Sequence, residues 1–386
     1  MLKRVYAHNY KCLQNFEFKV SNDECDKHNA LLIGKNGAGK STIADVLRIF
    51  QSIGRGNSNL LLLREGVQKF APVVSSDDFS FGRTDAPMRL EIDVEIDGKW
   101  CLYLLELELP PKFSALRVKT EKLTIDNEVR FSRETACITF SEHQQGTFEF
   151  DWHSIYLPSF PDRKEPVIME RFRSFLAKMI VISPIPQYMS DRYSNKTSYI
   201  DGSAVNIADW FMALLEQNPN AHAEATNHLV SMVPDFKMLG VVADSYGQKR
   251  LYAYFHNNKD EEIRFQFGIL SDGEKCMLLA VCVLMAKICD KECFCFWDEP
   301  DNYLAISEVE NFITIMRGSF LKKGQFFATT HNPETVACFE EHNTFIIYRD
   351  DHLLPTKSPA SVTEWREKNE IKSDFISAWI KGEVEL

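Results

Sequence analysis

The chain has 386 residues, of which 45% are hydrophobic and 26% are charged, and its formal net charge is −11. This length allows one large domain or two ordinary ones, and the composition is that of a globular protein. No apolar run approaches the roughly 20 residues that a membrane-crossing helix needs, and the first residues do not have the pattern of a signal peptide. We therefore expect a cytoplasmic protein without membrane contact. The acidic charge disfavours extended non-specific contact with nucleic acid but leaves room for a local basic groove.

The spacing of apolar residues predicts the elements of the first two thirds of the chain. The Asp97-Gly98 pair lies between two runs of alternating apolar and polar residues, which predicts a hairpin turn within an antiparallel region. In chain order we predict a half-buried strand at 16–20, a buried strand at 29–33, a helix with apolar positions from 43 to 50, a loop at 54–80, antiparallel strands from 90 to 150, and helices at 165–180 and 203–232.

Beyond Leu270, helices and strands alternate regularly, which implies a mostly parallel sheet with helices on its faces. The tail at 359–386 is amphipathic and predicts a helix that packs on the body or on a partner through Trp365, Phe375, Ile376 and Trp379. The predicted elements are a helix at 272–289, a strand at 292–297, a helix at 306–317, a strand at 325–330, a helix near 334–340 and a strand at 344–348.

The segment GKNGAGKS lies between a predicted strand and a predicted helix, which is the context of a phosphate-binding P-loop, or Walker A motif. Its glycines let the backbone approach phosphate oxygens, and the helix N-terminus attracts the anion. Lys40 would reach the β- and γ-phosphates of ATP, and the Ser41 hydroxyl would ligate Mg²⁺. The predicted phosphate-binding set is Gly34, Asn36, Gly37, Ala38, Gly39, Lys40, Ser41 and Thr42.

A second motif follows the apolar run FCFW, where Asp298 and Glu299 end a predicted buried strand. In a Walker B motif the first carboxylate holds Mg²⁺ through water, and the second orients or deprotonates the attacking water. A carboxylate pair after a strand also occurs as a helix N-cap, so this pair alone does not indicate a Walker B motif. The presence of the Walker A segment in the same chain favours that interpretation. We predict Asp298 as a metal ligand and Glu299 as a catalytic residue.

A third motif, LSDGE at 270–274, opens a long apolar helix and resembles the signature motif of ABC-type ATPases in the variant with Asp as third residue. The resemblance implies that Ser271 and Gly273 of one subunit close over the γ-phosphate that Lys40 of another subunit holds. Hydroxyl, backbone N–H and helix N-terminus would all face an anion. The alternative is an ordinary N-cap serine with acidic residues in the first turn.

Two more residues complete this resemblance. His331, at the end of a predicted strand, looks like the switch histidine that contacts the γ-phosphate, and we include it among the catalytic residues. Gln187 follows an apolar strand and is similar to the Q-loop glutamine, a ligand of Mg²⁺; the alternative is a solvated glutamine in a proline-rich loop. Ala305 departs from the family pattern, because many relatives carry Asp or His there.

The motif order resembles an ABC-type P-loop ATPase of the RecF/Rad50/SMC-like branch, whose first strand looks like residues 5–13. No heptad-bearing coiled coil follows Gln187, where that branch inserts its arms. The best resemblance is to the compact, armless ATPases of bacterial anti-phage defence, including those of Septu, retron-associated and PARIS systems and of the overcoming-lysogenisation-defect type.

This resemblance implies an α/β P-loop fold with a mostly parallel sheet flanked by helices, an antiparallel β subdomain and a helical subdomain. We expect one ABC-type domain over 1–386 that comprises a P-loop segment at 1–53, an antiparallel β subdomain and loop at 54–160, a helical or lid region at 161–269, a segment with signature, Walker B and switch histidine at 270–358, and a helical tail at 359–386.

The implied function is an ATPase that uses ATP and Mg²⁺, assembles head-to-tail as a homodimer or larger oligomer, and regulates a separate effector. About 38 residues follow Tyr348, fewer than a TOPRIM nuclease domain needs, so we expect the effector, a nuclease or toxin, on another chain. The alternatives are a DNA-repair or chromosome-associated ATPase that acts directly on DNA, and an ATP-clamped scaffold with negligible turnover.

Overall fold

A six-stranded sheet carries most of the loops that hold the candidate site. The computed structural model describes residues 1–20, 27–60, 63–65, 68–70, 72–140, 146–160, 167–194, 197–230, 232–257, 261–369 and 375. In spatial order the strands are β12 (Ile180–Ile182), β16 (Phe294–Asp298), β17 (Gln325–Thr330), β3 (Asn29–Ile33), β18 (Thr344–Ile346) and β19 (Ala360–Ser361). All neighbours pair in parallel except β18 and β19. The predicted, mostly parallel sheet is confirmed.

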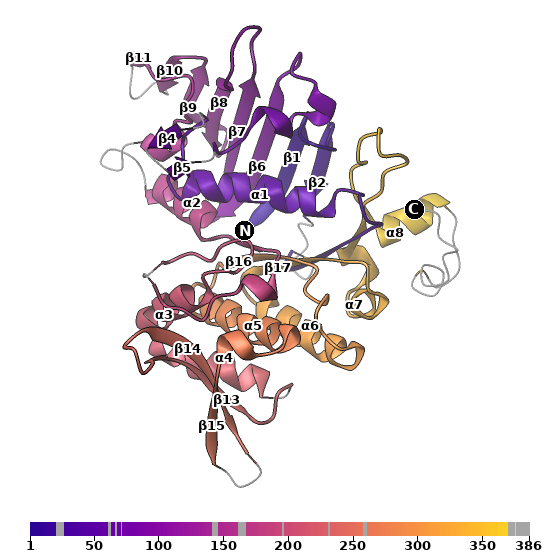
Figure 1. Ribbon diagram of the computed structural model, residues 1–386. Helices are drawn as coiled ribbons and strands as arrows, with labels where there is room; N and C mark the ends of the chain where they lie inside the picture. Colours follow the sequence, from indigo (N-terminus) through magenta and orange to yellow (C-terminus); the bar gives the residue numbers. More distant parts are fainter. Residues whose placement is uncertain are drawn as a thin grey trace.

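Both faces of this sheet are buried, which explains why its strands read as continuous apolar runs. Ala30 and Leu32 of β3 pack in one hydrophobic core, whereas Leu31 and Ile33 pack in the other. On the first face lie α1 (Lys40–Gly54) and α2 (Val167–Lys178). On the second face lie α3 (Ile207–Gln217), α4 (Pro219–Leu229), α5 (Asp272–Cys289), α6 (Ile306–Phe320) and α7 (Pro333–Ala337). In Figure 1, α1 lies above β16 and β17, and α3 to α6 lie below them.

A second sheet, of eight antiparallel strands, packs on α1 and α2 and confirms the predicted antiparallel subdomain. The predicted hairpin turn joins β6 to β7, where Asp97 and Gly98 both have positive φ. Its spatial order is β11 (Thr147–Glu149), β10 (Cys137–Phe140), β9 (Glu128–Glu134), β8 (Arg117–Ile125), β7 (Lys99–Glu108), β6 (Met88–Ile96), β1 (Leu2–His8) and β2 (Phe16–Lys19).

The helical region expected at 161–269 is only partly helical, and this expectation was wrong for its second half. This half contains a three-stranded antiparallel sheet of β13 (Phe236–Ala243), β14 (Lys249–His256) and β15 (Glu262–Gln266). Aromatic residues of β14, such as Tyr252 and Phe255, favour a strand, and Gly247 with its positive φ supplies the turn. The sheet lies at the lower end of the view in Figure 1.

Short ordered segments occur in the expected loop at 54–80. They are β4 (Leu63–Glu65), β5 (Gln68–Phe70) and two 3₁₀ turns, η1 (Ser76–Asp78) and η2 (Ser80–Gly82). Four more 3₁₀ turns are η4 (Leu157–Ser159), η5 (Pro186–Tyr188), η6 (Phe267–Ile269) and η7 (Glu341–Asn343).

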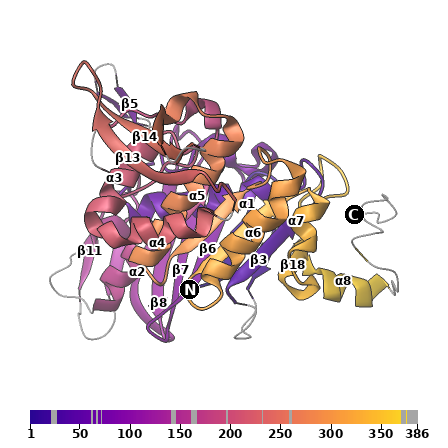
Figure 2. The ribbon, with the colours of Figure 1, turned by 90° about the horizontal axis from the view of Figure 1, so that it is seen from below.

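The tail contains α8 (Val362–Asn369), which lies at one edge of the molecule (Figure 2). The ring of Phe375 is buried, with its centroid 5.6 Å from that of Trp365, so this part of the tail packs on the body as expected. Ile376 and Trp379 lie outside the described residues. Among the described helices, none combines the length and the apolar character needed to cross a membrane.

Candidate nucleotide-binding site

The turn between β3 and α1 has the backbone geometry of a phosphate cradle. Gly37 and Gly39 have φ values of 80° and 107°, which a side chain would make costly. At Gly34 the reason for glycine is space, because an added Cβ would stand 2.2 Å from the carbonyl oxygen of Ile347. Lys40 then begins α1, so the first N–H groups of the helix face the turn.

Lys40 is held beside this turn by its own loop. Its Nζ donates to the carbonyl of Gly34 at 2.8 Å and to that of Lys35 at 3.4 Å. Burial lowers the pKa of Lys40, and the negative charges of Glu299 and Asp298 oppose that shift. Among the described residues no carboxylate forms an ion pair with Lys40, so this buried cation is well placed to bind a phosphate.

Asp298 ends β16 and is fixed by two hydroxyl groups. Thr329 Oγ1 donates to Oδ1 of Asp298 at 2.5 Å, and Ser183 Oγ donates to Oδ2 at 3.1 Å. Parallel pairing places Thr329 directly opposite Asp298. Sequence reasoning missed Ser183, which follows the edge strand β12.

Glu299, the residue after Asp298, has a left-handed backbone conformation with a φ of 53°. This conformation is uncommon for residues other than glycine. Its N–H donates to Thr329 Oγ1 at 3.0 Å, and its Oε1 lies 3.2 Å from Nδ1 of His331. Asn302 Nδ2 donates to the other carboxylate oxygen at 2.6 Å. The structure therefore brings the two predicted residues Glu299 and His331 together, and it adds Asn302, which sequence reasoning missed.

The residues predicted to hold Mg²⁺ fit that ion in part. Ser41 lies on the first turn of α1, and Asp298 ends β16; one hydroxyl and one carboxylate match the few protein ligands that Mg²⁺ takes beside phosphates and waters. Gln187 is placed elsewhere, because its Nε2 donates to Oδ2 of Asp272 at the start of α5. Its role as a metal ligand stays a prediction. Within the described part of the chain, no group of three or more His, Cys, Asp or Glu side chains is arranged to hold a metal.

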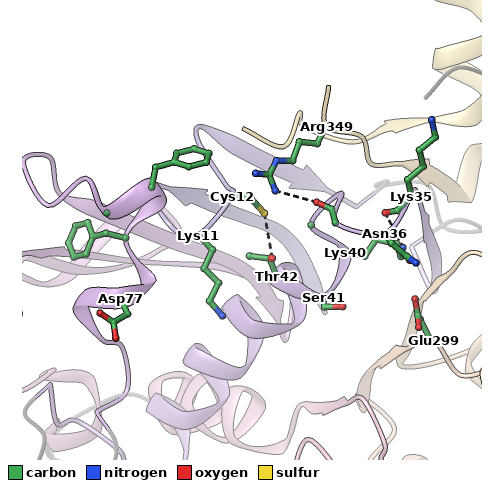
Figure 3. Close-up of a pocket in the computed structure, with 15 residues that line it drawn as sticks. Lys11, Cys12, Lys35, Asn36, Lys40, Ser41, Thr42, Asp77, Glu299 and Arg349 are labelled. Carbon is green, nitrogen blue, oxygen red and sulfur yellow. Dashed lines mark hydrogen bonds between the residues drawn. The ribbon is translucent and has the colours of Figure 1, made fainter. Parts of the chain in front are cut away.

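A cavity of about 610 Å³ opens beside the P-loop, and Figure 3 shows the side chains that line it. Glu299 reaches it from the turn after β16, while Arg349 comes from the loop after β18 and donates to the Gly37 carbonyl at 3.3 Å. Phe81 of η2 is 47% exposed, and its ring centroid lies 6.0 Å from the Arg349 guanidinium. The lining residues are Lys11, Cys12, Lys35, Asn36, Gly37, Gly39, Lys40, Ser41, Thr42, Asp77, Phe79, Phe81, Gly82, Glu299 and Arg349.

The left-handed backbone of Phe81, with a φ of 52°, is unusual for an aromatic residue. Sequence reasoning missed Phe81 because a Phe-Gly pair in a predicted loop is a weak signal. It missed Arg349 because the partner of that residue is 312 positions away.

The signature segment lies outside the lining of this cavity. Ser271 caps α5, since it accepts from the Glu274 N–H at 3.3 Å and its Oγ donates to the Glu274 carboxylate at 2.6 Å. This is the N-cap that we gave as the alternative interpretation of Ser271. Because Ser271 is exposed, the cap does not exclude a contact between Ser271 and a nucleotide of another subunit. An added Cβ at Gly273 would stand 2.7 Å from the carbonyl oxygen of Tyr303, so glycine is required at that position.

Comparisons with known proteins bear on the family and the fold of the chain. A family model described as "AAA domain, putative AbiEii toxin, Type IV TA system" matches residues 30–337. A search of curated proteins found no match. One similar solved structure is an Smc head bound to the C-terminal winged-helix domain of ScpA, with 12% identity, a TM-score of 0.55 and coverage of 94% of this chain and 99% of that chain.

Two further structures align over similar lengths. The SMC head domain from Thermotoga maritima has 13% identity, a TM-score of 0.46 and coverage of 93% and 98% of the two chains. The Smc head with an extended coiled coil bound to the C-terminal domain of ScpA, derived from Pyrococcus furiosus, has 11% identity, a TM-score of 0.45 and coverage of 96% and 98%. The family match and the first structure identify an SMC-head-like α/β P-loop ATPase fold.

Proposed function

Because the chain belongs to the AAA-domain family whose description names the AbiEii toxin and type IV toxin–antitoxin systems, we propose that it hydrolyses ATP and thereby regulates a separate effector. The observation that carries the ATPase part is the convergence of three elements on one site. Lys40 lies in the P-loop cavity, Glu299 lines the same cavity, and His331 contacts the carboxylate of Glu299.

Each group would have a defined task on the substrate ATP. The N–H groups of the P-loop and the Lys40 ammonium bind the β- and γ-phosphates. Phe81 stacks on the adenine base, and Arg349 fixes that end of the cavity to the P-loop. Mg²⁺, held by Ser41 and by Asp298 through water, would neutralise phosphate charge.

Glu299 accepts a proton from the attacking water and is thus the general base of the proposed reaction. His331 contacts the Glu299 carboxylate at 3.2 Å, and 53% of its own side chain is exposed. That position lets it contact the γ-phosphate and respond to its loss. Thr329 fixes Asp298 and the Glu299 backbone together, so both carboxylates keep one geometry.

We further propose that two copies assemble head-to-tail around ATP. Ser271 and Gly273 lie outside the cavity of their own chain, although Ser271 is exposed at a helix N-terminus that could receive an anion. A second copy would bring these residues to the γ-phosphate. The similar Smc head with a TM-score of 0.55 was solved bound to a domain of ScpA, and by analogy a partner protein is expected here as well.

The effector is proposed to be a nuclease or toxin in bacterial anti-phage defence. The support for this step is the toxin–antitoxin description of the family together with the resemblance of the motif set to compact defence ATPases. Direct action on DNA is the competing function. Salt-dependent, ATP-promoted binding of duplex DNA by the purified chain would favour that function instead.

Three variants test the ATPase and its assembly together. Glu299→Gln should bind ATP but turn it over at least about a hundredfold more slowly, and it should sediment as a dimer or larger species with ATP. Ser271→Arg should bind ATP with unchanged affinity yet remain monomeric. Mixing Lys40→Ala with Ser271→Arg should restore one complete site. If Glu299→Gln hydrolyses ATP at the wild-type rate, that carboxylate is not the base.

A further inference from the structure

The carboxylate of Glu299 is held by Asn302, which is not among the predicted site residues. Asn302 Nδ2 donates to its Oε2 at 2.6 Å, and the Asn302 N–H donates to the Glu299 carbonyl at 3.3 Å. The second carboxylate oxygen, Oε1, lies 3.2 Å from Nδ1 of His331. Each oxygen therefore has its own partner, and the two partners come from different segments of the chain.

The turn that carries Asn302 is itself anchored. Asp301 is only 5% exposed, and its Oδ2 accepts from Thr330 Oγ1 at 2.6 Å and from Thr335 Oγ1 at 2.5 Å. Thr330 directly precedes His331, and Thr335 lies in α7. Because Asp301 ties the turn to the strand end that bears His331, Asn302 and His331 are held in a fixed relation around Glu299.

The chemistry of an amide suits this position. A free glutamate side chain samples several rotamers, and a directional donor to one oxygen removes much of that freedom. An arginine or lysine at residue 302 would pair with the carboxylate and make it a weaker proton acceptor, whereas a neutral amide orients it with a smaller effect on its basicity.

We propose that Asn302 is a positioning residue that fixes the Glu299 carboxylate in the orientation from which it accepts a proton from the attacking water. The inference rests on the proposed ATPase function. The inference predicts that ATP turnover depends on the Asn302 side chain. ATP binding should not depend on it, because Asn302 lies outside the lining of the nucleotide cavity.

The test compares Asn302→Ala and Asn302→Asp with the wild-type chain. Asn302→Ala removes the donor, so kcat should fall roughly tenfold or more while KM and ATP affinity stay within about twofold. Asn302→Asp places a second carboxylate beside Glu299. Repulsion between like charges favours protonation of the pair, so the pH profile of kcat should move to higher pH.

Asn218→Ala is the matched control, because this substitution also removes one side-chain hydrogen bond. Oδ1 of Asn218 accepts from the Asn220 N–H at the start of α4, outside the site. Its kcat and pH profile should equal those of the wild type. If kcat of Asn302→Ala stays within about twofold of wild type, or if the loss appears in KM, the inference is overturned while the ATPase proposal stands. A wild-type chain without turnover would overturn both.

Discussion

Replacement of Phe81 by alanine should weaken ATP binding without slowing the chemical step. Phe81 is 47% exposed in the nucleotide cavity and keeps a left-handed backbone that would be easier for glycine. Stacking of a base on an aromatic ring is worth roughly 1–3 kcal/mol, which corresponds to a roughly 5- to 150-fold rise in Kd. The P-loop and Glu299 are untouched, so kcat at saturating ATP should stay unchanged.

Equilibrium dialysis with two ligands measures this directly. ATP should bind more weakly to Phe81→Ala, whereas inorganic tripolyphosphate, which has no base, should bind equally to both proteins. Phe113→Ala is the matched control, because Phe113 is 38% exposed and lies outside the cavity. Equal ATP affinity of Phe81→Ala and wild type, or an equal loss for tripolyphosphate, would refute the stacking argument. Phe81→Gly should match the alanine variant in affinity and, since it relieves the backbone strain, exceed it in unfolding free energy by about 1 kcal/mol.

Two further predictions concern buried charges. Lys40→Met should abolish ATP-induced stabilisation yet raise the melting temperature of the nucleotide-free protein at pH 7. Burial lowers the pKa of Lys40 below its unfolded value of 10.5, so the unfolded state binds the proton more tightly and the buried charge destabilises the fold at lower pH. The wild-type protein should therefore gain stability as pH rises through the alkaline range. A lower melting temperature of Lys40→Met than of the wild type would contradict this sign. Glu121→Ala should cost about 3–5 kcal/mol in urea unfolding, because Glu121 and Arg133 are both fully buried 3.5 Å apart and the arginine would lose its counter-charge. A cost below about 1 kcal/mol would mean that the backbone carbonyls around Arg133 suffice to hold it.

Residues that act through their immediate neighbours could be predicted from the sequence. The P-loop turn, the end of β16 and the start of α5 each depend on a few consecutive residues, and these elements lie where the sequence predicts them, although the serine cap of α5 was only the alternative interpretation of Ser271. The mostly parallel sheet followed from regular alternation of apolar runs and helical periods.

Features that depend on distant partners could not be predicted. Ser183 contacts Asp298 across 115 positions, and nothing in the local pattern indicates that pairing. Asn302 stands in a loop where an asparagine is ordinary, and its contact with Glu299 depends on the left-handed backbone of the glutamate. The β13–β15 sheet was missed because its register is set by pairing between strands and not by local spacing.

Successive side chains of β3 pack in two different hydrophobic cores, so this strand couples the stabilities of the two halves of the molecule. Leu32 belongs to the core under the antiparallel sheet, and its neighbours Leu31 and Ile33 belong to the core among α3 to α6. Loosening of either core would disturb the strand that ends in the P-loop, so we expect the stabilities of the two cores to be coupled through β3. A ligand held by the P-loop should therefore slow hydrogen exchange around both cores, and a cavity made in either core should lower nucleotide affinity.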